Sequence, residues 1–441
     1  MTDSGKSFSW DGQGKKYLLC VLSAGLVIRI IYAWLAVSVA PWNDMAVYDS
    51  ARLTILNHGK YIYGGSWPPG YPLLLAAITF VFGDGYLPLY LTQAVISSLT
   101  CLLIYLIAKK TFNGTAGFIA LLISSFYVDM IWYSGILLAE TFGIFLLCAV
   151  VYLLLLKKSP AIPGVLFGLT CLVKGVYLIS FPALLLWIFL ISDRKKAVSA
   201  AAKFAAFTFL AISPWTVWNS FEHGKFVLLT PHEGGSVFMG HNPSATGGAD
   251  FDFMDKDFAG FYNDNSLSEA QKSQMAFNFG VDYALHHPAR EVQLFFLKLS
   301  KYWSLRTHFD PNNGPYPLKR TFFYLSIAIH SLLFPACFLG AVFSLKNKSA
   351  AISAFAICIN TLVFTTLYFA SGRMRFQLVP FIIILASYGF SLTPEIISRF
   401  RKSGMADISG KVTAAATLTL LLYANFIMQA VEKHKDIARR F

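Results

Sequence analysis

The sequence predicts an all-α protein that crosses a membrane many times. Hydrophobic residues make up 56 % of the 441 residues and charged residues only 13 %, about half the charged share of an ordinary globular chain. Uninterrupted apolar runs of membrane-spanning length recur from residue 17 to residue 430, and such runs predict transmembrane helices. The net charge of +13 does not indicate nucleic-acid binding, because the basic residues lie where cytoplasmic helix ends are expected.

Basic clusters assign the loops to the two sides of the membrane, since cytoplasmic loops carry an excess of Lys and Arg. The clusters begin at Lys15, Lys109, Lys157, Arg194, Lys346 and Arg399. Eleven spans satisfy them, near 17–37, 86–108, 114–132, 136–156, 162–175, 177–192, 199–218, 321–345, 349–370, 376–393 and 412–430. The stretch 71–83 is too short to span, because about 20 residues are needed, so we expect an interfacial or re-entrant helix. The basic C-terminal tail would then lie outside, which leaves its side and the last span open.

The predicted spans divide the chain into three parts. They are an N-terminal transmembrane module (1–218) with a first outer loop (38–85), an extracytoplasmic region (219–320) and C-terminal transmembrane helices (321–441). Two amphipathic stretches that meet at Pro288 predict two helices in the extracytoplasmic region. The shortened helices before and after Lys174 are typical of segments that line a cavity at membrane depth.

Acidic residues near the predicted outer surface are the candidate catalytic groups. Asp44 follows the first span, and a carboxylate there could act as a general base toward an incoming hydroxyl. The alternative is a solvated loop acid. Glu140 lies just inside the outward end of a span, where an ionised group needs a partner or water, or where it compensates a helix dipole. The two could position an acceptor or hold a divalent ion, and Asp129 is a further candidate at the same depth.

Three basic residues near the same surface are candidates for binding a phosphate group. Arg373 and Arg375 offer bidentate contacts and Lys174 a point charge. The alternative for the arginines is snorkelling to lipid headgroups. The acidic run 249–258 lacks the Gly and Glu of a calcium loop and is interpreted as solvated. The sequence has no P-loop or G-x-G-x-x-G motif, so nothing indicates the use of ATP or of a nucleotide sugar.

Several short patterns follow one another in an order that resembles a known superfamily. An Asp and a Tyr after the first span precede a Pro-Pro-x-Tyr-Pro stretch, here Asp44, Tyr48 and 68–72. They are followed by Tyr-Ser and Glu-Thr within 133–141, Lys174 before Pro182, P-W-x-x-x-N at 214–219, His-Asn-Pro at 241–243 and R-x-R before a Pro at 373–380. The stretch 20–393 thereby resembles the GT-C superfamily of integral-membrane glycosyltransferases. It is most similar to the bacterial branch related to protein O-mannosyltransferases and the lipid A aminoarabinose transferase.

The resemblance implies an inverting transfer of one sugar from a polyprenyl-phosphate carrier to a hydroxyl of an envelope glycan, lipid or protein. The reaction would occur at the outer face of a bacterial cytoplasmic (inner) membrane, without nucleic acid as a partner. Asp44 and Glu140 would be catalytic, with Mg or Mn as the candidate cofactor between them. The donor phosphate would contact Lys174, Arg373, Arg375 and Tyr48, and the substrate would be lined by Asp49, Trp67, Tyr71 and Asn242.

Departures from the family pattern narrow the expectation. The aminoarabinose branch has an Arg three residues after the Asp and a Lys before the Pro-Pro, where this chain has Val47 and Trp67. The soluble domains of some protein mannosyltransferases are also absent. We therefore expect neither a lipid A aminoarabinose transferase nor a eukaryote-like protein mannosyltransferase. The alternatives are a flippase or transporter of polyprenyl-linked sugars, whose broken helices would look alike, and a glycan ligase that uses a diphosphate carrier. A non-enzymatic assembly subunit has no feature in its favour.

Overall fold

The computed structural model describes residues 12–61, 67–249, 264, 266–306, 316–403 and 409–438, and its regular elements within these ranges are all helices. The N-terminal half contains α1 (Gly12–Ala36), α2 (Asp44–His58), α3 (Gly70–Phe82), α4 (Tyr86–Thr111), α5 (Gly114–Ser125), α6 (Val128–Ser134), α7 (Glu140–Leu155), α8 (Ala161–Val173), η1 (Gly175–Ser180), α9 (Phe181–Ile191) and α10 (Arg194–His223). The rest contains α11 (Glu233–Gly240), α14 (Glu269–His286), α15 (Pro288–Tyr302), α16 (Lys319–Ser344), α17 (Ala351–Thr366), η2 (Phe376–Leu378), α18 (Val379–Ser403) and α19 (Ser409–Ala438). Most of the acidic run 249–258 lies outside the described residues.

The long apolar helices make this a multi-pass membrane protein. Six described helices are long and apolar enough to cross a membrane, or seven if α5 and α6, bent by 51°, form one span. The predicted all-α polytopic fold is confirmed, but the predicted number of eleven spans is not. The difference arises because α7, α8, α17 and the η1–α9 pair are apolar but only 10–17 residues long. The same holds for α3, for which the sequence predicted a helix too short to span.

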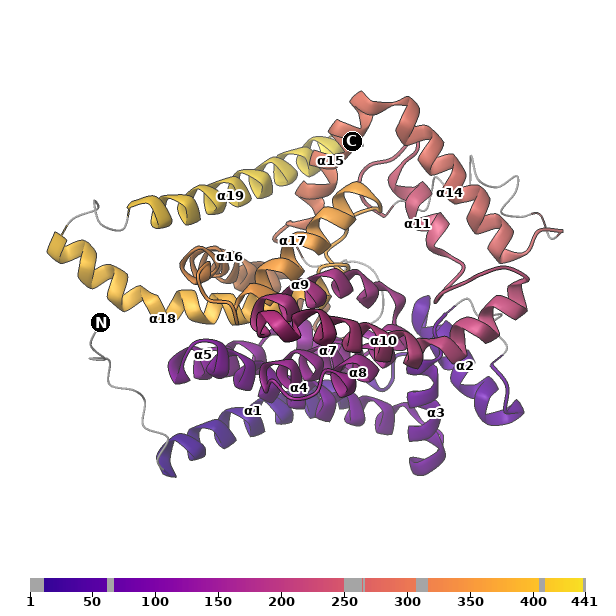
Figure 1. Ribbon diagram of the computed structural model, residues 1–441, viewed down its shortest axis with the longest axis horizontal. Coiled ribbons are helices and arrows are strands. Elements are labelled where there is room, and N and C mark those ends of the chain that lie inside the picture. Colours follow the sequence, from indigo (N-terminus) through magenta and orange to yellow (C-terminus); the bar gives the residue numbers. More distant parts are fainter. Residues whose placement is uncertain are drawn as a thin grey trace.

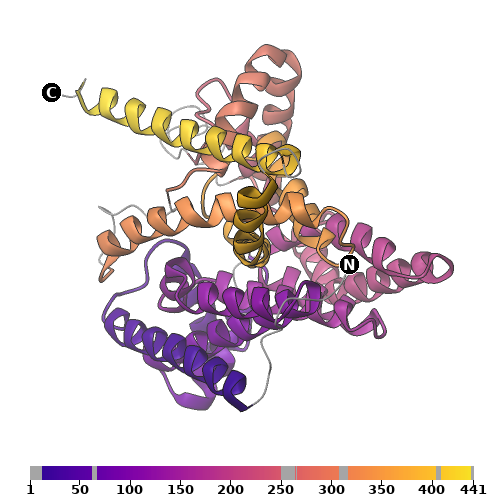
Figure 2. The ribbon, with the colours of Figure 1, turned by 90° about the vertical axis from the view of Figure 1, so that its left-hand side faces the viewer.

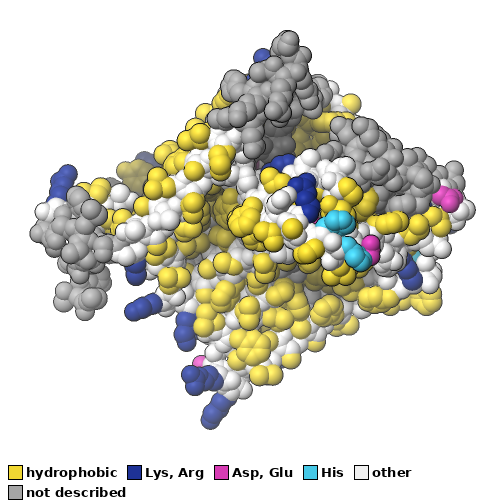
Figure 3. All heavy atoms as spheres, turned by 90° about the horizontal axis from the view of Figure 1, so that it is seen from above, with side chains coloured by type: hydrophobic (Ala, Val, Ile, Leu, Met, Phe, Trp, Pro, Cys, Tyr) yellow, Lys and Arg dark blue, Asp and Glu magenta, His cyan; other side chains and the backbone are white. Residues whose placement is uncertain are grey.

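The helices share one main direction, and the surface between their ends is apolar. In Figure 1 the long helices run roughly along the horizontal axis, and α2, α3, α11 and α14 gather toward the right-hand end. Figure 3 shows hydrophobic side chains over much of the face seen from above, with several Lys and Arg side chains toward its left-hand end. This distribution is typical of helices that cross an apolar layer and end in polar surroundings.

A buried arginine holds the bend between α5 and α6. Arg29 of α1 is 0 % exposed and donates from Nη2 to the Ser124 carbonyl oxygen at 3.0 Å and from Nη1 to that of Ser125 at 2.8 Å. The last carbonyls of a helix have no partner within the helix, and apolar surroundings offer them no water. Arg29 therefore supplies the donors that allow the chain to break at this depth.

The N-terminal and C-terminal helices form two parts that meet along one side. Figure 2 shows the indigo and purple helices below and the orange and yellow helices above. In the upper part, α16 and α18 approach so closely that a Cβ on Gly340 would lie 1.9 Å from the Leu385 carbonyl oxygen. Small residues permit such close helix packing in membranes. The close packing fixes α18 against α16 at this level.

Residues 269–302 form the two amphipathic helices that the sequence predicted on either side of Pro288. Helix α14 begins after a capping box in which Ser268 and Gln271 bond reciprocally, and it ends at His286. Helix α15 begins at Pro288, a position that proline favours because it lacks the amide hydrogen. The division of the chain into three parts stays a prediction.

Candidate functional site

Asp44 is held in place by the packing of α2 against the end of α3. Arg52 of α2, which is 2 % exposed, donates from Nη2 to Asp49 Oδ1 at 2.7 Å. Its Nη1 donates to Thr79 Oγ1 at 2.9 Å and to Asp84 Oδ1 at 2.8 Å. A buried guanidinium with this many partners fixes the helix that carries it. Asp44, the first residue of α2, therefore has a defined position.

Glu140 and Lys174 meet because two helices begin and end beside each other. Glu140 is the first residue of α7, while α8 ends at Val173 and leaves Lys174 in an extended conformation before η1. Lys174 Nζ donates to Glu140 Oε1 at 2.8 Å. The ring of Tyr177 packs against α7 next to Glu140, since a Cβ on Gly143 would lie 2.2 Å from this ring.

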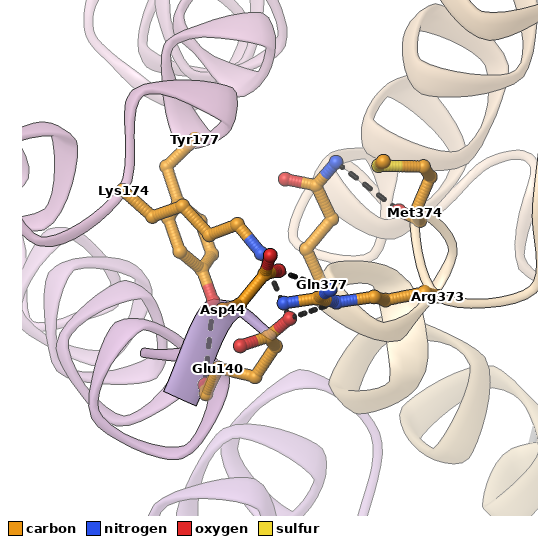
Figure 4. A network of polar contacts seen from close by, with 7 residues as sticks. All are labelled: Asp44, Glu140, Lys174, Tyr177, Arg373, Met374 and Gln377. Atoms are coloured by element: carbon orange, nitrogen blue, oxygen red, sulfur yellow. Dashed lines mark hydrogen bonds and ion pairs between the residues drawn. The ribbon is translucent and has the colours of Figure 1, made fainter. Parts of the chain in front are cut away.

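Arg373 joins these residues to Asp44 from the C-terminal half of the chain. Its Nε donates to Glu140 Oε1 at 2.7 Å and its Nη1 to Asp44 Oδ2 at 2.5 Å (Figure 4). Burial alone would lower the pKa of Arg373, but the charges of Glu140 and Asp44 and the hydrogen bond to Glu140 act together with Tyr133 to raise it. Two acids and two bases thus form one network, which we call the charge quartet: Asp44, Glu140, Lys174 and Arg373.

The members of the charge quartet differ in how far solvent reaches them. The side chain of Glu140 is 5 % exposed and that of Asp44 is 35 % exposed. Glu140 is the buried member of the charge quartet and neutralises both cations, whereas Asp44 is the more exposed acid. Glu140 Oε2 is buried and has no hydrogen-bond partner among the described residues. Solvent therefore reaches Asp44, whereas Glu140 is enclosed with Lys174 and Arg373.

An aromatic cluster adjoins the charge quartet and contains three of the predicted site residues. The ring of Tyr48 makes edge contacts with Trp67 and Tyr71, at centroid distances of 5.0 and 4.9 Å. Tyr71 also donates to Gln93 Oε1 at 2.9 Å. Tyr48 and Tyr71 are only 1 % and 0 % exposed, so the predicted contact of this cluster with substrate stays a prediction.

Other predicted site residues lie apart from the charge quartet. Asp49 binds Arg52 and accepts from Tyr86 at 2.9 Å. Asn242 donates from Nδ2 to the Phe238 carbonyl oxygen at 2.9 Å at the end of α11. Both residues therefore have a local structural partner, and their predicted contact with substrate stays a prediction.

Arg375 has different partners from Arg373, although only one residue separates them. It is 3 % exposed, donates to the Tyr302 carbonyl oxygen and, at 2.9 Å, to that of Ser304, and stacks over Phe334 at 4.8 Å. These contacts occupy its guanidinium with backbone and ring atoms. Its predicted binding to phosphate stays a prediction, with the charge quartet offering the better-placed cations.

Asp129, the further candidate acid, belongs to a separate buried cluster. Ser326 donates to Asp129 Oδ1 at 2.7 Å, and His330 Nε2 lies 3.6 Å from Asp129 Oδ2. Tyr127 contacts the same ring nitrogen at 2.6 Å. The partners of Asp129 are thus a hydroxyl and an imidazole from α16 rather than the cations of the charge quartet.

Sequence reasoning missed Tyr177 and Gly143. Tyr177 donates to the main-chain oxygen of Glu140 at 3.4 Å and occupies the space left by Gly143. A signal for Tyr177 existed, because residues three apart in a 3₁₀ helix lie on one side and Tyr177 follows Lys174 by three positions. Gly143 gave no comparable signal.

The charge quartet does not fit a divalent metal. The carboxylates predicted to hold Mg or Mn, Asp44 and Glu140, already contact Arg373 and Lys174. Hard divalent cations need about six oxygen ligands, and the described part of the chain has no group of three His, Cys, Asp or Glu residues that could hold a metal. The side chains of Arg373 and Lys174 occupy the space beside the two carboxylates that a metal ion would need.

Comparisons with known proteins agree with this fold. Residues 66–218 match the family described as dolichyl-phosphate-mannose-protein mannosyltransferase. No curated protein matches the chain in sequence. The oligosaccharyltransferase AglB from Archaeoglobus fulgidus, solved with an inhibitory peptide and a dolichol-phosphate, superposes with a TM-score of 0.55 at 18 % identity, over 96 % of this chain and 56 % of that one.

Two further solved structures are similar to the chain. The Archaeoglobus fulgidus oligosaccharyltransferase in complex with Zn and sulfate gives a TM-score of 0.51 at 15 % identity, over 93 % of this chain and 52 % of that one. ArnT from Cupriavidus metallidurans bound to undecaprenyl phosphate gives 0.44 at 11 % identity, over 87 % and 79 %. The chain thus spans little more than half the length of the oligosaccharyltransferase.

The helices thus share the fold of the Archaeoglobus fulgidus oligosaccharyltransferase. The resemblance to the GT-C superfamily that the sequence carries is confirmed by the family match and by the structural similarity.

Proposed function

We propose that the protein transfers a sugar from a polyprenyl-phosphate-linked donor to an acceptor hydroxyl, with the charge quartet as its active site. The observation that carries this proposal is the Arg373 bridge between Asp44 and Glu140. The bridge brings an accessible carboxylate and two cations together from distant segments of the chain. An acid that can take a proton beside cations that can bind a phosphate is the arrangement that such a transfer needs.

In the proposed reaction, the acceptor oxygen forms a bond to the anomeric carbon of the sugar while the bond from that carbon to the phosphate oxygen breaks. The acceptor proton goes to the Asp44 carboxylate. The bonding pair leaves with the polyprenyl phosphate, and Lys174 and Arg373 stabilise the negative charge that develops there. Glu140 keeps the two cations at a fixed separation, so that they need not reorganise during the reaction.

Arg373 links donor binding to the readiness of the base. Before the donor arrives, its guanidinium donates to Asp44. A donor phosphate attracts the same guanidinium with bidentate geometry, which weakens the contact with Asp44. The carboxylate then becomes a better proton acceptor when the donor is in place.

The proposal is tested with purified protein in lipid and a panel of radiolabelled polyprenyl-phosphate monosaccharides, with crude envelope as the acceptor. Wild type should release label from one carrier, and Asp44→Asn should not. Asp282→Asn is the matched control, because Asp282 is an exposed acid of α14 far along the chain from the charge quartet. If no carrier loses its label, and the protein instead moves the carrier between the two leaflets, the flippase alternative would replace the proposal.

A further inference from the structure

A second group of charged side chains lies outside the charge quartet, between the turn after α11 and helix α15. Lys298 is 0 % exposed and His241 is 5 % exposed. Lys298 Nζ lies 3.1 Å from His241 Nε2, and His241 Nδ1 lies 2.7 Å from Glu291 Oε2. We call these three residues the outer triad.

The chemistry of lysine fixes the direction of the hydrogen bonds in the outer triad. An ammonium can only donate, so His241 Nε2 accepts from Lys298, and Nδ1 carries the hydrogen that Glu291 accepts. The result is a continuous chain from a buried positive charge to a negative one. Glu291 Oε1 is buried and has no partner among the described residues, so the neutralising charge of Glu291 is directed at His241.

The turn that carries His241 contacts the segment that carries Arg373. A Cβ on Gly240 would lie 2.8 Å from the carbonyl oxygen of Tyr368. The Ala370 amide donates to the Gly247 carbonyl oxygen at 3.0 Å. On its other side, the turn touches α15, because a Cβ on Gly247 would lie 3.1 Å from the backbone nitrogen of Lys298. Residues 240–247 are thus packed between α15 and residues 367–370.

The segment 367–375 is attached to α15 at its other end as well. Arg375 donates to the carbonyl oxygens of Tyr302 and Ser304, at the C-terminal end of α15. Arg373 lies between the two attachments. Helix α15 in turn contacts α19, where Asn425 donates to the Ser300 carbonyl oxygen at 3.0 Å. A rigid α15 therefore fixes both ends of the segment from which Arg373 extends.

We infer that His241, Glu291 and Lys298 are positioning residues that hold residues 367–375 against α15 and thereby set the place of Arg373 in the charge quartet. Their effect on catalysis rests on the proposed function, whereas their effect on the order of the segment does not. Misplacement of a catalytic group by about 1 Å can cost a hundredfold in rate, so a distant support is enough to control turnover.

The energetics of the outer triad agree with a positioning role. Burial lowers the pKa of Lys298 to about 8, so the ionised side chain is held in place at a cost in folding free energy. A buried ionic group can often be replaced by apolar residues without loss of stability. A buried charged group that is costly and whose three members are joined by hydrogen bonds is better explained by the geometry it imposes than by the stability it adds.

The inference is tested by hydrogen exchange on the full chain in lipid nanodiscs, followed over the peptide that contains residues 367–375. Glu291→Gln leaves the charge of Lys298 uncompensated, so we expect amide exchange in this segment to rise about tenfold or more and kcat for sugar transfer to fall about 10- to 100-fold. Glu291→Gln combined with Lys298→Met removes both charges. The rise in exchange and the fall in kcat of this double variant should be smaller than the product of the effects of the two single variants.

The matched control is Glu269→Gln, which breaks an ion pair with Lys272 on α14 and should leave exchange in 367–375 unchanged. Unchanged exchange in Glu291→Gln, or an equal rise in the control, would overturn the inference. If Glu291→Gln does not fold, the double variant decides by the same readout. Increased exchange in Glu291→Gln, together with a wild-type protein that transfers no sugar, would keep the positioning role and reject the proposed function.

Discussion

The charge quartet and the Asp129 cluster both place an acid among the helices, but they surround it differently. Asp129 is 5 % exposed and accepts from the hydroxyl of Ser326. Asp44 has a side chain that is 35 % exposed and contacts the guanidinium of Arg373. A buried acid with neutral partners is typical of a structural network, whereas an accessible acid beside cations is typical of an active site. Depth in the membrane alone therefore does not distinguish them.

Replacing the two acids in turn should give the largest contrast. Asp44→Asn keeps the shape but cannot accept the acceptor proton, so we expect transfer to fall by about 10² to 10⁴-fold with an unchanged melting temperature. Asp129→Asn should transfer sugar at close to the wild-type rate but melt at a lower temperature, because a buried network is disturbed. Rates and melting temperatures of the two purified variants check this. Similar rates in both would remove the distinction between the regions.

Glu140→Gln should combine both kinds of effect. Removal of the carboxylate leaves Lys174 and Arg373 without their shared counter-charge, and breaking a buried ion pair costs about 3–5 kcal/mol. We expect lower stability together with a strong loss of transfer, measured by melting temperature and initial rate in the same preparation. A variant with wild-type rate and stability would show that Glu140 does not hold the cations.

Arg373→Lys should lower transfer less than Asp44→Asn or Glu140→Gln does, because the positive charge is kept. A lysine offers a point charge and cannot donate from two fixed directions to Asp44 and Glu140. The loss of one charge-assisted hydrogen bond, about 1.5–3 kcal/mol, corresponds to a fall of about 10- to 100-fold in transfer. Arg375→Lys is the comparison, and we expect it to affect the melting temperature more than the rate.

The smallest effect concerns pH and the outer triad. Burial lowers the pKa of Lys298 from its ordinary value of 10.5 to about 8. Between these two values, the unfolded chain binds the proton more readily than the folded one, so stability rises with pH. The melting temperature of wild type relative to Lys298→Met should therefore increase from about pH 8 to about pH 10.5. A decrease over this range would contradict the lowering of the Lys298 pKa by burial.

The sequence predicted the fold class and, as candidate site residues, all four members of the charge quartet, for identifiable reasons. Apolar runs and basic clusters report on membrane crossing directly. The placement of Asp44, Glu140 and Lys174 followed from their positions at the ends of apolar runs and from the order of family patterns. The resulting roles stay predictions, while their proximity to one another is a finding of the structure.

Other features could not be predicted, because they depend on three-dimensional contacts. Arg373 and Arg375 look equivalent in sequence, but the turn between Ser371 and Phe376 directs them to different partners. The pairing of Asp129 with His330 joins residues 201 positions apart, which a single sequence does not reveal. The number of spans was also out of reach, since short apolar helices give the same composition signal as parts of longer ones.

The most direct test of the central claim measures donor binding and turnover on the same sample of Asp44→Asn. The account predicts that this variant binds the polyprenyl-phosphate sugar at least as tightly as wild type, because Arg373 is released from Asp44 and is available to the phosphate. It also predicts that the bound donor is not consumed. Turnover at the wild-type rate, or loss of donor binding, would contradict the assignment of Asp44 as the base and of Arg373 as the phosphate ligand.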